Sequence, residues 1–320
     1  MTIPIWFISQ EIHGSAEPLY DLFVRFQPTE EDINVLLGDV GVNYTGRMRH
    51  RLLKQELCDM KSTFFCIHGN NENRPQNICS YQEKEWHGAR VLYEEDFPNI
   101  LFPIDGDLFD IEGKQCIVIG GVYSVDKVYR LRMGYNWWPD EQPTPTIKKY
   151  VEQQIRTHQV DVVFSHTCPY KYVPTECFLP GIDQSTADNS TEHWLDTIEE
   201  MLDYKAWYLG HWHINKRIDK LHTRSLGVCR LLCQYNISNI TSSLTSKEKY
   251  KKGKVQEKEQ CRIVPPITHL AHYVSCDKSP AATVIPDYDW SDSLSGCFRY
   301  RLSVLHEVGG ARPLSISGSR

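Results

Sequence analysis

The chain has 320 residues with a formal net charge of −6 at pH 7, and 41% of its residues are hydrophobic. This length and apolar content suit one large α/β domain with an appendage, or two domains of ordinary size. The negative charge argues against a general nucleic-acid surface. We find no apolar run of the roughly 18 residues that a membrane span needs, and no signal-peptide pattern at the start. The sequence therefore predicts a soluble cytoplasmic protein without a membrane partner.

The first part of the chain predicts alternating strands and helices. Apolar runs at 3–8, 33–37 and 63–67 are typical of buried strands, and helical spacing at 18–26 and 47–58 lies between them. Polar residues follow each predicted strand directly. This repeated pattern predicts parallel strands whose loops converge at one edge of a sheet.

The middle of the chain predicts a second sheet. Short runs at 100–102, 108–111 and 115–119, with turn signals between them, favour a meander of antiparallel strands. Beyond it we expect helices at 148–158 and 192–202 and strands at 160–164, 206–209 and 217–221. The second of these helices is amphipathic, with Trp194, Ile198 and Met201 on one face.

Residues 122–141 are predicted to form a long loop with many aromatic and charged side chains. Loops of this length are uncommon unless they bind or cover something, and Trp and Arg suit contact with a ligand. A surface loop fixed by its own aromatic residues explains the composition equally well, so both interpretations stay open. The candidate substrate contacts in this segment are Tyr123, Lys127, Arg130, Trp137 and Trp138.

The sequence from residue 226 onward changes in character. Residues 242–260 are rich in Lys and Glu with few apolar residues, and the last residues are rich in Gly, Ser, Pro and Arg. We therefore expect a domain of residues 1–225 followed by an extension, residues 226–320, that is largely disordered. The eleven cysteines have no paired spacing, and Cys66, Cys116 and Cys168 lie in or beside predicted strands, so we expect reduced, buried thiols.

Five polar clusters follow predicted strands. A single His or Asp at a strand end is more often structural, but five clusters rich in imidazole, carboxylate and amide oxygen are hard to explain that way. In open α/β sheets, ligands bind beyond the carboxyl ends of the strands. These ligand types suit divalent Mn, Fe or Zn. The clusters are Glu11-x-His13, Gly38-Asp39-x-Gly41, Gly69-Asn70-Asn71-Glu72, His166 and Gly210-His211-x-His213.

In order and spacing, these clusters resemble the motifs of calcineurin-like metallophosphoesterases, which are D-x-H, G-D-x-x-G, G-N-H-E/D, a strand-end H and G-H-x-H. The resemblance covers about residues 3–221, and residues 120–127 and 137–141 resemble a bacterial and phage-type branch. It implies a four-layer α/β/β/α sandwich of two mixed sheets with a dinuclear metal site at the strand ends. It also implies hydrolysis of phosphomono- or diesters of small molecules or nucleotides, by a hydroxide that bridges two divalent ions.

The resemblance also assigns ligands. The first ion would be held by Glu11, His13, Asp39 and His213, and the second by Asp39, Asn70, His166 and His211, with Asp39 bridging. The catalytic positions are then Asp39, Asn70 and Asn71, the last of which stands where the family has its His. In the long loop, Lys127 and Arg130 would meet a phosphate, while Trp137 or Trp138 would stack on a base.

Two positions depart from the family pattern. Glu11 replaces an Asp, which moves the carboxylate by about 1.5 Å, and a displacement of that order can cost on the order of 100-fold in rate. Asn71 replaces the His and cannot deliver a proton at neutral pH. Loss of general-acid catalysis typically costs about 10²- to 10⁴-fold.

These departures leave two interpretations. The chain is a metal-dependent phosphoesterase with impaired chemistry, or it is an inactive pseudo-enzyme that serves as a ligand- or protein-binding scaffold. An α/β protein without metal would leave five ordered motifs to coincidence. The sequence does not indicate which metals are bound or the oligomeric state.

Overall fold

The computed structural model describes residues 6–9, 11–44, 48–178 and 184–223. The prediction of an extension over residues 226–320, and of a domain boundary at residue 225, falls outside these residues. No helix within the described ranges is long and apolar enough to cross a membrane.

The first sheet has six strands in the order β1-β2-β3-β6-β5-β4. Strands β1 (Trp6–Ser9), β2 (Ile33–Leu36) and β3 (Thr63–Cys66) are parallel, as predicted. Their register places Ser9, Leu36 and Cys66 side by side, so all three strands end at the same level. Helices α1 (Glu17–Phe26) and α2 (Met48–Asp59) connect them.

The predicted meander over 100–119 is wrong, because its strands belong to different sheets. Strand β6 (Phe97–Pro103) runs parallel to β3 in the first sheet, whereas β7 (Leu108–Ile111) and β8 (Lys114–Ile119) pair with each other in the second. A turn pattern shows that the chain bends but not that the flanking strands pair. The sequence analysis also missed the hairpin β4 (Tyr81–Trp86) and β5 (Ala89–Glu94), because β4 is mostly polar and partly exposed.

The second sheet has the order β11-β12-β10-β9-β8-β7. Strands β8, β9 (Val162–Ser165) and β10 (Ala206–Leu209) are parallel and also end level with one another. The strand predicted at 217–221 is instead a hairpin of β11 (Lys216–Ile218) and β12 (Leu221–Thr223). Asp219 has a φ of 51° in the turn between them.

The remaining helices include one that was not predicted. Helix α4 (Pro145–Thr157) begins where the Thr144 side chain accepts a hydrogen bond from the backbone of Ile147, and α5 (Ser190–Met201) packs near it. Residues 122–141 are not one continuous loop, because they contain helix α3 (Lys127–Met133). Single 3₁₀ turns lie at η1 (Pro75–Asn77), η2 (Tyr170–Tyr172) and η3 (Thr175–Cys177).

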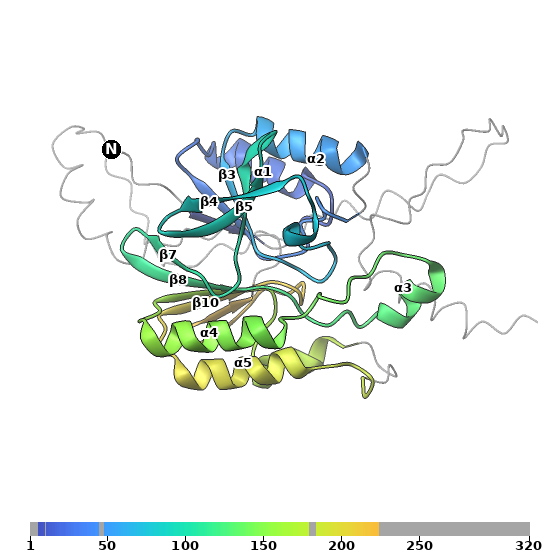
Figure 1. The fold of residues 1–320 in the computed structure, drawn as a ribbon, viewed down its shortest axis with the longest axis vertical. Coiled ribbons are helices and arrows are strands. Elements are labelled where there is room, and N and C mark those ends of the chain that lie inside the picture. The colour runs from blue at the N-terminus through green and yellow to red at the C-terminus, as the bar shows by residue number, and fades with distance from the viewer. Residues whose placement is uncertain (1–5, 10, 45–47, 179–183, 224–320) are drawn as a thin grey trace, which may run out of the picture. The chain divides into compact units, whose positions relative to one another are not determined.

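The two sheets pack face to face, with helices outside. Figure 1 shows α1 and α2 against the first sheet and α4 and α5 against the second. One hydrophobic cluster joins the inner faces of both sheets, through side chains such as Val35, Phe65 and Phe164. Neighbouring side chains on a strand point to opposite faces, so Leu36 packs under the helices instead. This is the predicted four-layer α/β/β/α arrangement. On α5, Trp194 and Ile198 are buried, but Met201 at the helix end is exposed.

Candidate metal centre

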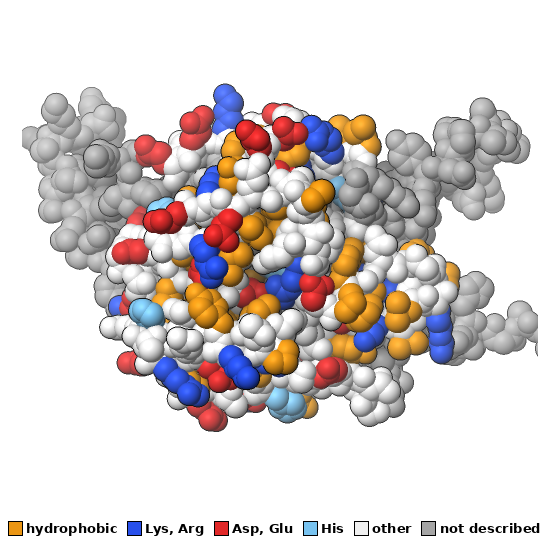
Figure 2. Space-filling view, in the orientation of Figure 1, with side chains coloured by type: hydrophobic (Ala, Val, Ile, Leu, Met, Phe, Trp, Pro, Cys, Tyr) orange, Lys and Arg blue, Asp and Glu red, His pale blue; other side chains and the backbone are white. Residues whose placement is uncertain are grey.

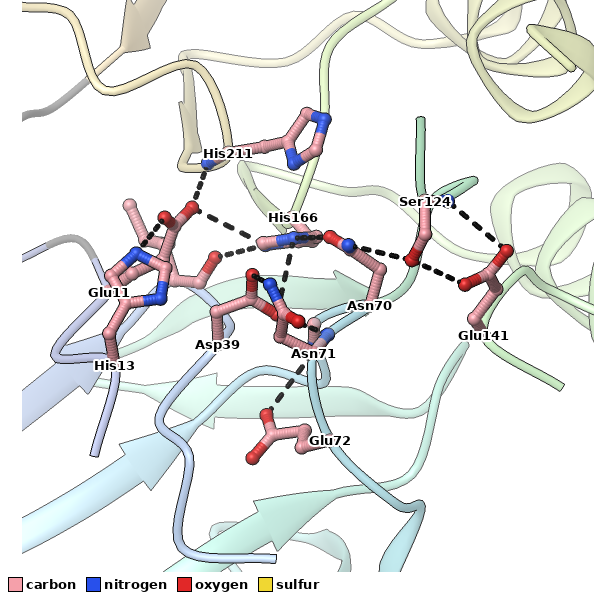
Figure 3. A network of polar contacts seen from close by, with 12 residues as sticks. Glu11, His13, Asp39, Asn70, Asn71, Glu72, Ser124, Glu141, His166 and His211 are labelled. Carbon is pink, nitrogen blue, oxygen red and sulfur yellow. Dashed lines mark hydrogen bonds and ion pairs between the residues drawn. The ribbon is translucent and has the colours of Figure 1, made fainter. Parts of the chain in front are cut away.

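The polar clusters of both sheets meet at the edge where the parallel strands end (Figure 3). Glu11 follows β1 and Asp39 follows β2, while His166 follows β9 and His211 follows β10. The two sheets are joined here by a hydrogen bond from His166 Nδ1 to the carbonyl oxygen of Leu37, at 2.8 Å. The common level of the strand ends therefore brings together residues that lie as far apart as 11 and 213 in the sequence.

The first ligand group consists of Glu11, His13 and His213, whose donor atoms all lie within 4.8 Å of one another. Glu11 Oε2 is 3.0 Å from His13 Nε2 and 2.9 Å from His213 Nε2. Burial favours a neutral carboxyl, but these two imidazoles outweigh it and hold the pKa of Glu11 well below its usual value. Burial likewise opposes protonation of the two imidazoles, but Glu11 raises the pKa of each.

The second ligand group shares Glu11 and adds His166 and His211, again with donor atoms within 4.8 Å. Glu11 Oε1 accepts a hydrogen bond from the backbone N–H of His211 and lies 3.9 Å from His166 Nδ1. Burial, together with the neighbouring His166, lowers the pKa of His211 to about 3. Its ring is therefore neutral at pH 7, which is the form that binds metal ions.

Asn70 faces His166 in a way that suits a bound cation. Asn70 Oδ1 is 2.9 Å from His166 Nε2. Because His166 Nδ1 donates to the Leu37 carbonyl, a neutral His166 ring presents only a lone pair at Nε2. A neutral ring would therefore place two hydrogen-bond acceptors opposite each other in a buried position, and a shared positive ion would stabilise them. The donor set of imidazole, carboxylate and amide oxygen fits first-row divalent metals.

Asp39, predicted as the bridging ligand, belongs to neither ligand group in this structure. Its Oδ1 accepts a hydrogen bond from the backbone N–H of Asn71 at 2.7 Å, and its Oδ2 accepts one from Asn71 Nδ2 at 3.0 Å. A carboxylate has about four lone-pair positions, so both oxygens can still bind a metal ion. The bridging role of Asp39 stays a prediction.

The backbone around the ligands is strained. Four predicted ligands have left-handed φ angles, which non-glycine residues seldom adopt and which cluster at functional sites. They are His13 at 45°, Asp39 at 44°, His211 at 70° and His213 at 50°.

Two motif glycines allow the ligands to approach closely. A Cβ atom on Gly38 would lie 1.9 Å from His166 Nδ1, and one on Gly69 would lie 2.0 Å from Asp39 Oδ1. Gly38 also has a φ of +111°, a conformation that other residues rarely adopt. The site is therefore closed around its ligands in a way that only glycine permits.

A family model described as calcineurin-like phosphoesterase matches residues 3–215. The chain belongs to this family. The narrower bacterial and phage-type branch stays a prediction.

Solved structures are similar at low sequence identity, and no curated protein sequence matches the chain. The crystal structure of TT1561 of Thermus thermophilus is 12% identical, covers 70% of this chain and 91% of that chain, and has a TM-score of 0.40. The crystal structure of phosphopantetheinyl hydrolase (PptH) from Mycobacterium tuberculosis is 14% identical, covers 69% of this chain and 88% of that chain, and has a TM-score of 0.38.

Helix α3 exposes apolar side chains and buries a charged one. Val128, Leu131 and Met133 are exposed on its surface, where Figure 2 shows apolar side chains, whereas Arg130 is buried with only 6% exposure. Arg130 Nε donates to Asp126 Oδ1 at 2.7 Å. Its Nη1 is buried and finds no hydrogen-bond partner among the described residues. Burial of a charged group without full pairing is costly, so Arg130 is a candidate ligand contact.

Arg130 also lies close enough to the metal centre for its charge to act there, since it interacts electrostatically with His13 and Asp39. Of the other predicted substrate contacts, Lys127 begins α3, and Tyr123, Trp137 and Trp138 flank it in the sequence. Lys127 Nζ lies over the Trp137 ring, 4.1 Å from its centroid, and 5.8 Å from the Tyr123 centroid. Trp138 meets the Tyr44 ring edge-on, with 5.4 Å between centroids. None of these substrate roles is tested by the structure.

The sequence analysis quoted Glu72 within a motif but gave it no role. Its carboxyl group is fully buried and accepts hydrogen bonds from the backbone N–H groups of Gly41 and Gly69, both at 3.3 Å. Burial, together with the charge of Asp39, raises the pKa of Glu72 to about 8. Glu72 thus connects the loop that carries Asp39 to the loop that carries Asn70.

The sequence analysis gave no role to Ser124 or Glu141, although both lie in the segments 120–127 and 137–141 that it quoted. Both are buried, at 1% and 2% exposure, and they connect Asn70 to the segment that carries α3. The signal that could have identified them is weak, because it consists only of polar residues in the segment that resembles the family branch.

Proposed function

We propose that this member of the family is a metal-dependent phosphoesterase that hydrolyses phosphomono- or diesters of small molecules or nucleotides. The observation that carries the proposal is the pair of ligand groups that share Glu11 at the ends of both sheets. Two divalent ions bound there would polarise the phosphoryl group and activate water for in-line attack. Mn, Fe and Zn all suit this donor set.

The ligands divide between the two groups by position. His13 and His213 would serve one ion, and Asn70, His166 and His211 the other. Glu11 belongs to both ligand groups, so we propose that it contacts both ions, together with Asp39 as the predicted bridge. On this view the longer side chain of Glu11 reaches further into the centre than the Asp of the family.

The substrate phosphate would meet Arg130. Its unpaired Nη1 can donate to a phosphate oxygen, and Arg suits such contacts because its donors form a planar fork. Lys127 and Trp137 already contact each other by a cation–π interaction, so they form one surface beside the site. The described cysteines are free thiols, which supports the cytoplasm as the proposed location.

Asn71 determines how the leaving group departs. Its amide donates to Asp39 and has no proton to release at neutral pH, so the leaving oxygen would have to depart without protonation by residue 71. Substrates with basic leaving groups should therefore react most slowly. The alternative function, an inactive scaffold that binds a phosphate ligand or protein, rests on this same substitution.

Two measurements test the proposal. Titration of the purified chain with Mn²⁺ should give two bound ions, and fewer than one would refute both metal-based functions. Hydrolysis of p-nitrophenyl phosphate and phenyl phosphate should then be compared in the wild type, in Asn71→His and in the control Asn77→His, which lies at an exposed position of η1.

The expected result depends on the leaving group. Asn71→His should accelerate phenyl phosphate by about 10²- to 10⁴-fold and p-nitrophenyl phosphate by less, because general-acid catalysis matters most for basic leaving groups. A silent wild type beside an active Asn71→His variant would favour the scaffold. If both are silent while two ions bind, Glu11→Asp becomes the next variant to test.

A further inference from the structure

The orientation of the Asn70 side chain decides whether the second ligand group can hold a metal ion. A carboxamide has two ends of similar shape, an oxygen that binds metals and an NH₂ group that does not. If the amide were rotated by half a turn, its NH₂ group would donate to the lone pair at His166 Nε2. In the absence of metal that rotated form would be satisfied locally, so something else must hold the oxygen in place.

A directional chain of hydrogen bonds fixes the observed orientation (Figure 3). Asn70 Nδ2 donates to Ser124 Oγ at 3.0 Å, and Ser124 Oγ donates to Glu141 Oε2 at 2.5 Å. The Ser124 hydroxyl has a single proton. Because that proton points to Glu141, the hydroxyl oxygen can only accept from Asn70, and so only the NH₂ end of the amide fits there.

Glu141 is itself held in the accepting state by its surroundings. Its Oε1 accepts from the Ser124 backbone N–H at 3.1 Å, and its Oε2 also accepts from the Trp137 indole N–H at 2.8 Å. Every partner of this carboxyl group among the described residues is therefore a donor, and these donors favour the carboxylate against burial, which raises the pKa of Glu141. The carbonyl oxygen of Glu141 accepts from the backbone N–H of Val122 at 3.1 Å, which fixes the main chain as well.

We propose that Ser124 and Glu141 are positioning residues that turn the amide oxygen of Asn70 toward the metal centre. The inference rests on the proposed function, since it concerns one of the two proposed ions. It assigns a role to the segment at 122–141 that does not depend on contact with substrate. The same segment carries Arg130 and Trp137, so it would position both the metal ligand Asn70 and the proposed substrate contacts.

The expected effect is selective. Loss of a residue that orients a metal ligand typically weakens metal binding by about 10- to 100-fold. Ser124→Ala removes the acceptor that Asn70 uses, and Glu141→Gln places an amide donor in a network built for an acceptor. Each variant should lower the affinity for one Mn²⁺ ion by that factor and change the affinity for the other by less than about 3-fold. The second ion is spared because the group of His13 and His213 does not contact this chain of hydrogen bonds.

The test is calorimetric titration of Mn²⁺ into the full chain, with thermal unfolding of the metal-free protein measured in parallel. Glu152→Gln is the matched control, since Glu152 also accepts an indole N–H, from Trp194 at 3.1 Å, on the far helix pair. The control should bind both ions as the wild type does. A loss of both ions alike in Ser124→Ala and Glu141→Gln would indicate general damage and overturn the proposal, as would unchanged binding of both.

A second experiment, in the Asn70→Asp variant, tests directly whether the orientation of the residue 70 side chain matters. In the Asn70→Asp variant both ends of the side chain are oxygens, so there is no orientation to lose. Ser124→Ala should then cost less than about 3-fold in that background, against about 10- to 100-fold in the wild type. An equal cost in both backgrounds would refute the positioning role. A wild type that binds fewer than one ion would refute the proposed function itself, which distinguishes the two failures.

Discussion

Glu192 should make the protein less stable as the pH rises through neutrality. It lies on the first turn of α5 with 2% exposure. Its Oε1 accepts from the Thr167 hydroxyl at 3.2 Å, while its Oε2 is buried with no hydrogen-bond partner among the described residues. Burial raises the pKa of Glu192 from 4.5 to about 7, because the ionised form has lost its hydration.

The sign and size follow from the proton balance. Below pH 4.5 the folded and unfolded states both hold the proton, and the cost of ionisation is absent. Between pH 4.5 and 7 the folded state holds more protons than the unfolded state, so the free energy of unfolding falls as pH rises. Above pH 7 the full cost is present, on the order of 3 kcal/mol at about 1.4 kcal/mol for each unit of pKa.

Glu192→Gln keeps the shape and removes the charge. Urea unfolding of the metal-free chain gives the free energy of unfolding of the variant minus that of the wild type. This difference should be larger at pH 8 than at pH 5 by about 2–3 kcal/mol. Glu200→Gln, at an exposed position of the same helix, should show no such increase. An equal difference between Glu192→Gln and the wild type at both pH values would refute the reasoning, since the effect would then not come from ionisation.

Three further predictions concern the metal centre and the proposed phosphate contact. The Gly38→Ala variant should not bind the ion that His166 would hold, because the added Cβ would overlap the His166 ring. The control variant Gly88→Ala also has a positive φ at the substituted position but has open space around it, so it should bind both ions. The affinity for Mn²⁺ should rise from pH 6 to pH 8, because Glu11 raises the pKa of His13 and His213 and both imidazoles must lose a proton when the ion binds. Calorimetry that finds no proton release on binding would contradict this. Arg130→Lys should raise KM for a phosphodiester by about 10-fold with a smaller change in kcat, because Lys lacks the planar fork, and an unchanged KM would exclude the phosphate contact.

The layered fold could be predicted because buried parallel strands leave a strong signal. Three apolar runs, each followed by polar residues and separated by helical patterns, were enough to give β1, β2 and β3. The hairpin of β4 and β5 could not be found in this way, because β4 is a mostly polar and partly exposed strand whose sequence resembles that of a loop. The sheet to which β6 belongs was also hidden, because pairing depends on where the chain crosses between layers and not on the composition of the strand.

The candidate ligands could be predicted from their order along the chain, but their mutual contacts could not. Both ligand groups share Glu11 because the parallel strands of each sheet end level with one another, which is a property of register, and because the two sheets contact each other at these ends. Ser124 and Glu141 are 17 residues apart with no motif between them. Ser124 contacts Asn70, and Glu141 contacts Ser124, only because the segment after β8 returns to the edge of the first sheet. No local pattern encodes that return.

Under the proposed function, Asn71 would have two effects, one favouring metal binding and the other slowing turnover. Its backbone and side chain hold both oxygens of Asp39, which fixes that carboxylate beside the ligand groups and lowers the cost of ordering it when an ion binds. The same amide withholds the proton that a leaving oxygen needs. Metal and phosphate binding are therefore expected to be preserved, while turnover falls with the basicity of the leaving group. An enzyme and a scaffold built on this site would bind the same ligands, and the turnover of substrates with activated leaving groups is the property that separates them.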